Sequence, residues 1–187
     1  MCKELGNISQ GFGKQKGTDT VKFLTHEEIQ KIPPDRTVTY ARIVIDYRAQ
    51  KDDPNRIRIT VDGNLIDYPD ELTTRTADLT TTKLLWNSII STPDAKYMCV
   101  DIKSFYLETP LDRYEYIKMK LYLFPQEFRN KYSLDSKAKD GYVFMEIQKG
   151  MYGLPQAGII VNKLLKKHLA KKGYYELSMC RAQSCSP

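Results

Sequence analysis

Two segments rich in β-branched and aromatic residues stand close together in the chain, and they limit its fold more than any other feature. They read TVTYARIVIDY over residues 37–47 and RIRITV over residues 56–61. Branched and aromatic side chains fit a pleated surface, so both segments are predicted to be strands. The Asp-Gly-Asn sequence at residues 62–64 is typical of a hairpin turn, and we expect the chain to return through residues 65–66.

Length and composition place the chain among proteins with a single core. It has 187 residues, 41% of them hydrophobic, which is enough for one domain. Its first residues lack the apolar stretch of a secretory signal, and no run is long and apolar enough for a membrane span. The four cysteines include no CxxC pair, which argues against a zinc finger. We therefore expect no membrane partner and an intracellular protein, cytoplasmic or nuclear.

The predicted elements alternate between helix and strand after an irregular start. Residues 1–33 are expected to form a flexible leader that ends in a short helix, capped by Thr25 and Glu28 and stopped by the prolines at 33–34. The remaining predicted elements are helices at 79–91 (capped by Asp78), 125–132 and 159–172, and strands at 96–102, 114–119 and 142–147. This mixture predicts an α+β fold.

The predicted strand 96–102 is apolar on both faces and ends near Asp101. A strand of that kind is usually central in its sheet. A lone aspartate at a strand end is normally a turn residue or a helix cap. It is also a stiff support for a divalent ion, together with a neighbouring carbonyl such as that of Ile102. Tyr106 follows five residues after Asp101, where a turn would bring its ring back to the same place.

The segment 150–158 predicts a tight turn that opens a basic helix. Gln156 would lie near the N-terminus of that helix, where free N–H groups favour an anion. Alternatively, Gln156 is an ordinary surface residue of a glycine-rich loop. The helix carries Lys163, Lys166 and Lys167, which form either a solvated face or a track for phosphates. The net charge of +6 is compatible with a polyanionic partner.

Arg42 shares one face of the first strand with Val44 and Asp46, while the opposite face, Ile43, Ile45 and Tyr47, is assigned to the core. Arg42 is either solvated or presents its guanidinium to a triphosphate, whose geometry it matches.

Three motifs taken in order, RIVIDYR (42–48), CVDIKSFYL (99–107) and MYGLPQAG (151–158), resemble the fingers and palm of reverse transcriptases. The likeness is greatest to the copia type of LTR retrotransposons and extends over residues 38–176. It implies a partial right-hand polymerase fold with an antiparallel palm sheet packed on helices. Residues 34–177 would be the fingers and palm, and residues 178–187 a tail foreign to the family.

The resemblance also implies roles for individual residues. Asp101 is similar to the first Mg²⁺-binding aspartate, with the carbonyl of Ile102 as a further metal ligand. Tyr106 resembles the aromatic gate that selects deoxynucleotides. Gln156 and Arg42 resemble the contacts to the incoming dNTP and its triphosphate. The partners would be an RNA or DNA template–primer and a dNTP, with the lysines of the basic helix near the template.

The sequence also departs from the family. The aromatic-x-Asp-Asp hairpin that supplies the remaining metal ligands does not occur after Tyr106, and the thumb is missing. Since one carboxylate does not hold two divalent ions, we expect a fragment that is inactive alone, cut from its reading frame by a frameshift, a splice junction or an early stop. Two alternatives remain: a non-catalytic nucleic-acid-binding remnant that uses Arg42 and the basic helix, or a poorly folding pseudogene product.

Overall fold

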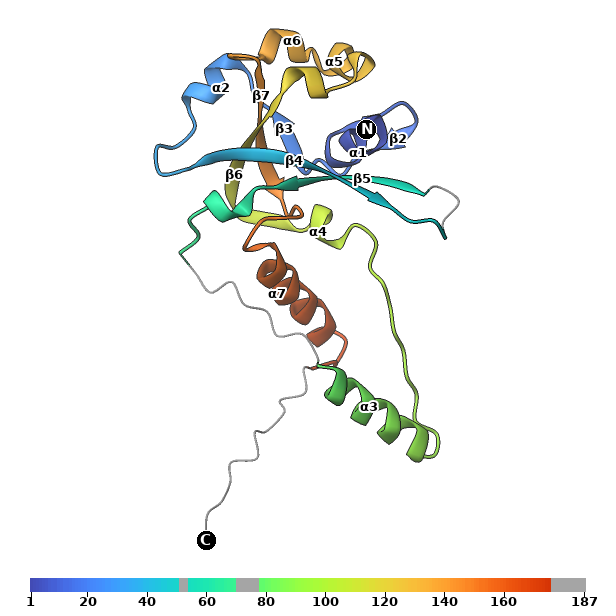
Figure 1. Ribbon diagram of the computed structural model, residues 1–187. Coiled ribbons are helices and arrows are strands. Elements are labelled where there is room, and N and C mark those ends of the chain that lie inside the picture. Colours follow the sequence, from blue (N-terminus) through green and yellow to red (C-terminus); the bar gives the residue numbers. More distant parts are fainter. Residues whose placement is uncertain (51–53, 70–77, 176–187) are drawn as a thin grey trace.

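The computed structural model describes residues 1–50, 54–69 and 78–175, and its centre is a mixed five-stranded sheet (Figure 1). The strand order is β3-β7-β6-β4-β5. All neighbours are antiparallel except β4 and β6, which pair in parallel over Val38–Tyr40. The strands are β3 (Val21–Phe23), β4 (Val38–Tyr47), β5 (Asn55–Val61), β6 (Pro110–Lys120) and β7 (Tyr142–Lys149). The α+β class is confirmed, and the expected antiparallel sheet is antiparallel at every pair except β4–β6.

The core forms where β7, which alternates buried and half-buried residues, pairs with the buried positions of β6. Ile117 faces Met145 and Met119 faces Val143, all four of them buried. Phe128 of α5 is fully buried on this layer, with its ring centroid 4.5 Å from that of Tyr132. Period-2 alternation of this kind buries one face of each strand, so these two strands and the helices packed on them hold the fold together.

Seven α-helices occur in the described ranges: α1 (Cys2–Ile8), α2 (His26–Gln30), α3 (Leu79–Ser91), α4 (Phe105–Glu108), α5 (Gln126–Tyr132), α6 (Leu134–Lys137) and α7 (Ala157–Ala170). Two predicted caps are confirmed. Thr25 and Glu28 form a capping box on α2, and the Asp78 carboxylate accepts a hydrogen bond from Thr81 N on α3. None of the described helices has the length and apolar character of a membrane span.

Residues 1–33 were expected to be a flexible leader with one short helix; the short helix forms, but other parts of the segment are regular too. The first residues form α1 and a small hairpin of β1 (Gly11–Phe12) and β2 (Gln15–Lys16), and β3 joins the main sheet. Leu5 and Ile8 of α1 are 0% and 1% exposed in the core. Their burial orders a segment whose own sequence shows no strong periodicity, because tertiary packing supplies most of the stability of a short helix.

The hairpin turn predicted at residues 62–64 is also wrong. β4 and β5 pair with each other, from Ala41↔Val61 to Tyr47↔Asn55, so the reversal lies in the connection between them. Gly63–Leu65 is a 3-10 helix that leads the chain away from the sheet. The outer half of the β4–β5 hairpin projects beyond the sheet, which leaves Ile45 and Tyr47 71% and 70% exposed instead of in the core (Figure 1).

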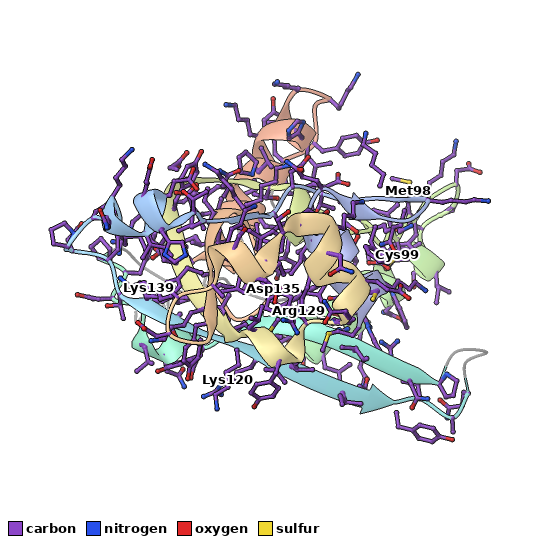
Figure 2. All side chains as sticks on the ribbon, turned by 90° about the horizontal axis from the view of Figure 1, so that it is seen from above. Met98, Cys99, Lys120, Arg129, Asp135 and Lys139 are labelled. Carbon is purple, nitrogen blue, oxygen red and sulfur yellow. The ribbon has the colours of Figure 1, made fainter. Side chains whose placement is uncertain are left out.

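The strand predicted at residues 96–102 does not form. Residues 95–102 have no regular secondary structure, and Met98 and Val100 are 76% and 66% exposed. Figure 2 shows Met98 and Cys99 at the periphery of the molecule. A strand needs a neighbour to accept its backbone hydrogen bonds, and no described strand pairs with this segment. The predicted tail, residues 178–187, lies outside the described residues.

Candidate functional site

The turn before α7 packs backbone against backbone on the end of β5. Val61 N donates to Tyr152 O at 2.8 Å. Gly153 has φ +91°, and a Cβ there would lie 2.2 Å from Val61 O. A Cβ at Gly63 would lie 2.0 Å from Gly153 O. Only glycine permits this approach, which fixes the position of the turn and of Gln156 at its end.

The same turn also contacts α4, which carries Tyr106. The ring centroids of Tyr106 and Tyr152 are 5.5 Å apart and the rings are tilted by 44°. Gly150 N donates to Thr109 O at 2.7 Å, and a Cβ at Gly150 would lie 2.6 Å from Tyr106 O. Two segments widely separated in sequence, each containing a predicted site residue, therefore meet in the fold.

Gln156 points into the protein. Its side chain is 1% exposed and its Nε2 donates to Glu115 Oε1 at 3.0 Å. Its Oε1 is buried and has no hydrogen-bond partner in the part of the chain that is described. The alternative of an ordinary surface residue is therefore wrong. Glu115 was not among the predicted site residues, although it occupies an inward position of β6, opposite Ile147, where an apolar residue is the rule.

Glu115 is a buried carboxyl group with two polar neighbours. Arg113 Nε lies 3.1 Å from its Oε1, and Gln156 contacts the same oxygen. Burial raises the pKa of Glu115, and the charge of Arg113 opposes that rise. Arg113 is held in turn by Nη2 donating to Asp67 O at 2.9 Å. The result is a buried acid whose partners are fixed, with a proton affinity above that of a solvated glutamate.

Asp101 and Ile102 are exposed and belong to the irregular segment before α4. The Asp101 side chain makes no hydrogen bond or ion pair with any described residue, whereas Gln156 is buried and bonded to Glu115. Within residues 1–50, 54–69 and 78–175, no group of three or more His, Cys, Asp or Glu side chains can hold a metal ion. The Mg²⁺ site was expected in the complete family enzyme, with weak or absent binding in this chain, and that expectation stays a prediction; magnesium chemistry on phosphates needs several oxygen ligands.

The predicted cationic residues all lie at the surface. Arg42 Nη2 is 2.6 Å from Asp62 Oδ2, and the Arg42 side chain is 60% exposed. Lys163, Lys166 and Lys167 are exposed on α7, and spacings of three and four residues put them on one face of that helix. These side chains are accessible to an anion, although Arg42 would have to share or leave its contact with Asp62.

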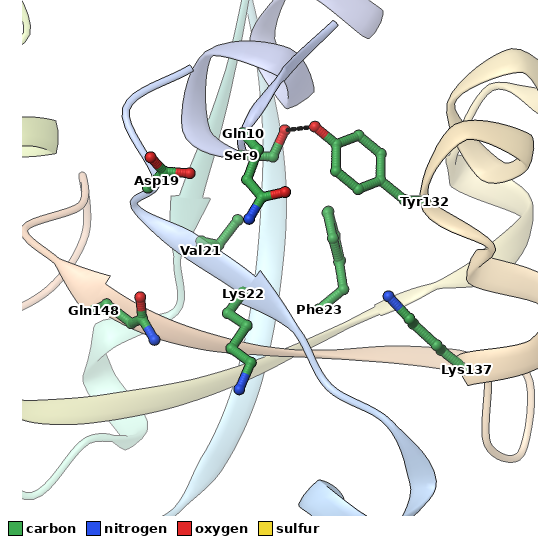
Figure 3. Close-up of a pocket in the computed structure, with 9 residues that line it drawn as sticks. All are labelled: Ser9, Gln10, Asp19, Val21, Lys22, Phe23, Tyr132, Lys137 and Gln148. Atoms are coloured by element: carbon green, nitrogen blue, oxygen red, sulfur yellow. Dashed lines mark hydrogen bonds between the residues drawn. The ribbon is translucent and has the colours of Figure 1, made fainter. Parts of the chain in front are cut away.

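A separate pocket of about 400 Å³ opens beside β3 (Figure 3). Its apolar wall includes Val21 and Phe23, and Ser9 Oγ and the Tyr132 hydroxyl form a hydrogen bond of 2.9 Å at its edge. Lys22 in this pocket is already paired with Glu28 at 2.7 Å. None of the predicted site residues lines the pocket.

No protein-family model matches the chain, and comparison with curated proteins and with solved structures finds no significant match.

Proposed function

We propose that this chain is a fingers and palm portion of an RNA-directed DNA polymerase of the retrotransposon type, which does not extend a primer by itself. The observation that carries the proposal is the contact between Tyr106 on α4 and Tyr152 in the turn before α7. The two segments that meet there contain two of the three motifs that resemble reverse transcriptases.

The position of Asp101 supports the second half of the proposal. Addition of a nucleotide requires attack of a primer 3′-hydroxyl on the α-phosphate of a dNTP, and two Mg²⁺ ions would stabilise the charges on the attacking and leaving oxygens. Asp101 is not part of any group of three or more His, Cys, Asp or Glu side chains that could hold such ions within the described residues. Gln156 is engaged with Glu115 and would have to turn outward to contact a nucleotide.

Primer extension tests this proposal. A DNA primer annealed to an RNA template is incubated with dNTPs and Mg²⁺ and the chain, and no product is expected. A second protein joins this chain to a copia-type segment with the aromatic-x-Asp-Asp hairpin and the thumb, and it should extend the primer. Asp101→Asn in that longer protein should abolish extension, whereas Asp19→Asn, a change of the same kind outside the three motifs, should not.

Three results would contradict the proposal. The first is extension by the unmodified chain. The second is extension by the longer protein that does not depend on Asp101. The third is a longer protein that folds and binds the template–primer but does not extend it.

A second candidate function is nucleic-acid binding without catalysis. The exposure of the lysines on α7 and of Arg42 favours it, because exposed cations can neutralise phosphates without an ordered metal site. Binding of this kind weakens steeply as salt increases, so the absence of binding at low salt would remove this candidate.

A further inference from the structure

A hollow of about 860 Å³ lies between α1, the outer half of the β4–β5 hairpin and the segment that leads into α4. None of its lining residues is a predicted site residue, although Arg48, Lys103 and Ser104 belong to two of the three motifs. It consists of Met1, Lys3, Glu4, Asn7, Gln15, Arg48, Asn55, Arg56, Ile57, Lys103 and Ser104. Ligand pockets span about 300–1,000 Å³, so the hollow is large enough for an extended ligand.

The hollow is strongly basic. Four of its lining side chains are cationic, namely Lys3, Arg48, Arg56 and Lys103, and Glu4 is the one acidic residue among those that line it. Arg48 is paired with Asp46 at 3.2 Å. The other three cations have no carboxylate within ion-pair distance among the described residues. Positive charge in the hollow therefore exceeds the negative charge available to balance it.

The environment of Arg56 shows the effect of this excess. Burial lowers the pKa of Arg56, and the neighbouring charges of Arg58 and Arg48 lower it further. Burial also raises the pKa of Glu4, and the charges of Arg56 and Arg58 oppose that rise. Arg58, two residues along the same strand face, stacks 5.4 Å from the centre of the Tyr152 ring, and its Nε has no hydrogen-bond partner in the described chain. An anion in the hollow would relieve this repulsion.

We propose that this hollow binds the phosphates of a single-stranded nucleic acid. The cations come from four separate segments and are spread along the hollow, as a chain of phosphates requires, instead of belonging to one loop. Asn7, Gln15 and Asn55 add neutral amides that can bond to sugars or bases. The inference shares its partner class with the proposed function, but its residues are different from Arg42, Gln156 and the lysines of α7.

Fluorescence anisotropy of a labelled oligouridylate over a range of salt concentrations tests the proposal, without Mg²⁺ or dNTPs. The test protein is the double variant Lys3→Gln/Lys103→Gln, both of whose lysines are exposed. The matched control is Lys31→Gln/Lys139→Gln, which removes the same charge at two other exposed positions. Loss of two phosphate contacts should reduce the slope of log K against log salt by about 1.4, and we expect roughly tenfold weaker binding at low salt. The control should change binding by less than about twofold.

Arg56 provides a second measurement that a general loss of structure would not imitate. Arg56→Gln should weaken binding, whereas Arg56→Lys keeps the charge and should retain most of the salt dependence. Urea unfolding of each variant checks that the fold is intact. These readouts do not depend on primer extension, so failure of the polymerase proposal and failure of this one are distinguishable.

Three outcomes would overturn the assignment. The first is binding that is lost in Lys163→Gln/Lys167→Gln but unchanged in Lys3→Gln/Lys103→Gln and Arg56→Gln. The nucleic acid would then bind at α7 instead of in the hollow. The second is displacement of the oligonucleotide by inorganic tripolyphosphate at equal phosphate concentration, which would make the hollow a site for free polyphosphates or nucleotides. The third is the absence of any binding at low salt.

Discussion

Replacement of Gly153 by alanine tests whether the backbone contact between the turn and β5 fixes the candidate site. Two costs combine at this position. The residue has φ +91°, where an alanine is strained, and the new Cβ would lie 2.2 Å from Val61 O. Relieving the overlap displaces the turn and weakens the 2.8 Å hydrogen bond from Val61 N to Tyr152 O. Strain and the lost bond together predict a loss of about 3–4 kcal/mol in the free energy of unfolding.

Gly141 supplies the matched control. It also has a positive φ, +77°, but a Cβ there meets nothing within 4 Å. Gly141→Ala should therefore cost only the backbone strain, about 1 kcal/mol. Gly63→Ala tests the other side of the same contact, because its Cβ would lie 2.0 Å from Gly153 O. The double variant Gly63→Ala/Gly153→Ala should lose less than the sum of the two single losses, since both disrupt one contact.

Urea unfolding followed by circular dichroism measures these differences in the free energy of unfolding. Thermal unfolding provides a check, because each kcal/mol lost should lower Tm by about 2–4 °C. The reasoning is refuted if Gly153→Ala and Gly141→Ala are equally stable. It is refuted equally if the losses from Gly63→Ala and Gly153→Ala simply add.

Three further predictions concern other parts of the fold. Burial raises the pKa of Glu115, so its contribution to stability is greatest at low pH and is lost as pH rises through the folded-state pKa. The free energy of unfolding, measured in urea, should therefore depend less on pH in Glu115→Gln. An unchanged pH profile would contradict this. The hydrogen bond from Thr81 N holds the pKa of Asp78 below its usual value. Asp78→Ala should speed amide exchange in α3 and leave the free energy of global unfolding unchanged, because α3 has no buried residue. Phe128 is 0% exposed, so Phe128→Ala should lower the free energy of unfolding by about 3–5 kcal/mol, and a loss near zero would show that the α5 layer is not part of the core.

Local sequence patterns determined two kinds of feature. These are helix caps, which depend on residues a few positions apart, and strands with a marked preference for one buried face. The capping box at Thr25 and the cap at Asp78 were predictable because a side chain and a backbone N–H a few residues away suffice to form them. The strand around residues 142–147 was predictable because alternate positions mark one face for burial, and both it and the strand predicted at 114–119 form. The turn before Gln156 was predictable from its glycines, but the burial of Gln156 against Glu115 was not.

Only the tertiary structure decided what these elements contact. Residues 96–102 have a strand-like composition but no pairing partner, and so Asp101 is exposed in an irregular segment. The first residues form α1 because Leu5 and Ile8 are buried against the core. Glu115, which binds Gln156, lies 41 residues before it, and the basic hollow joins α1 to β5 and Lys103. Contacts between distant segments depend on how the sheet is assembled, and no local pattern of residues contains that information.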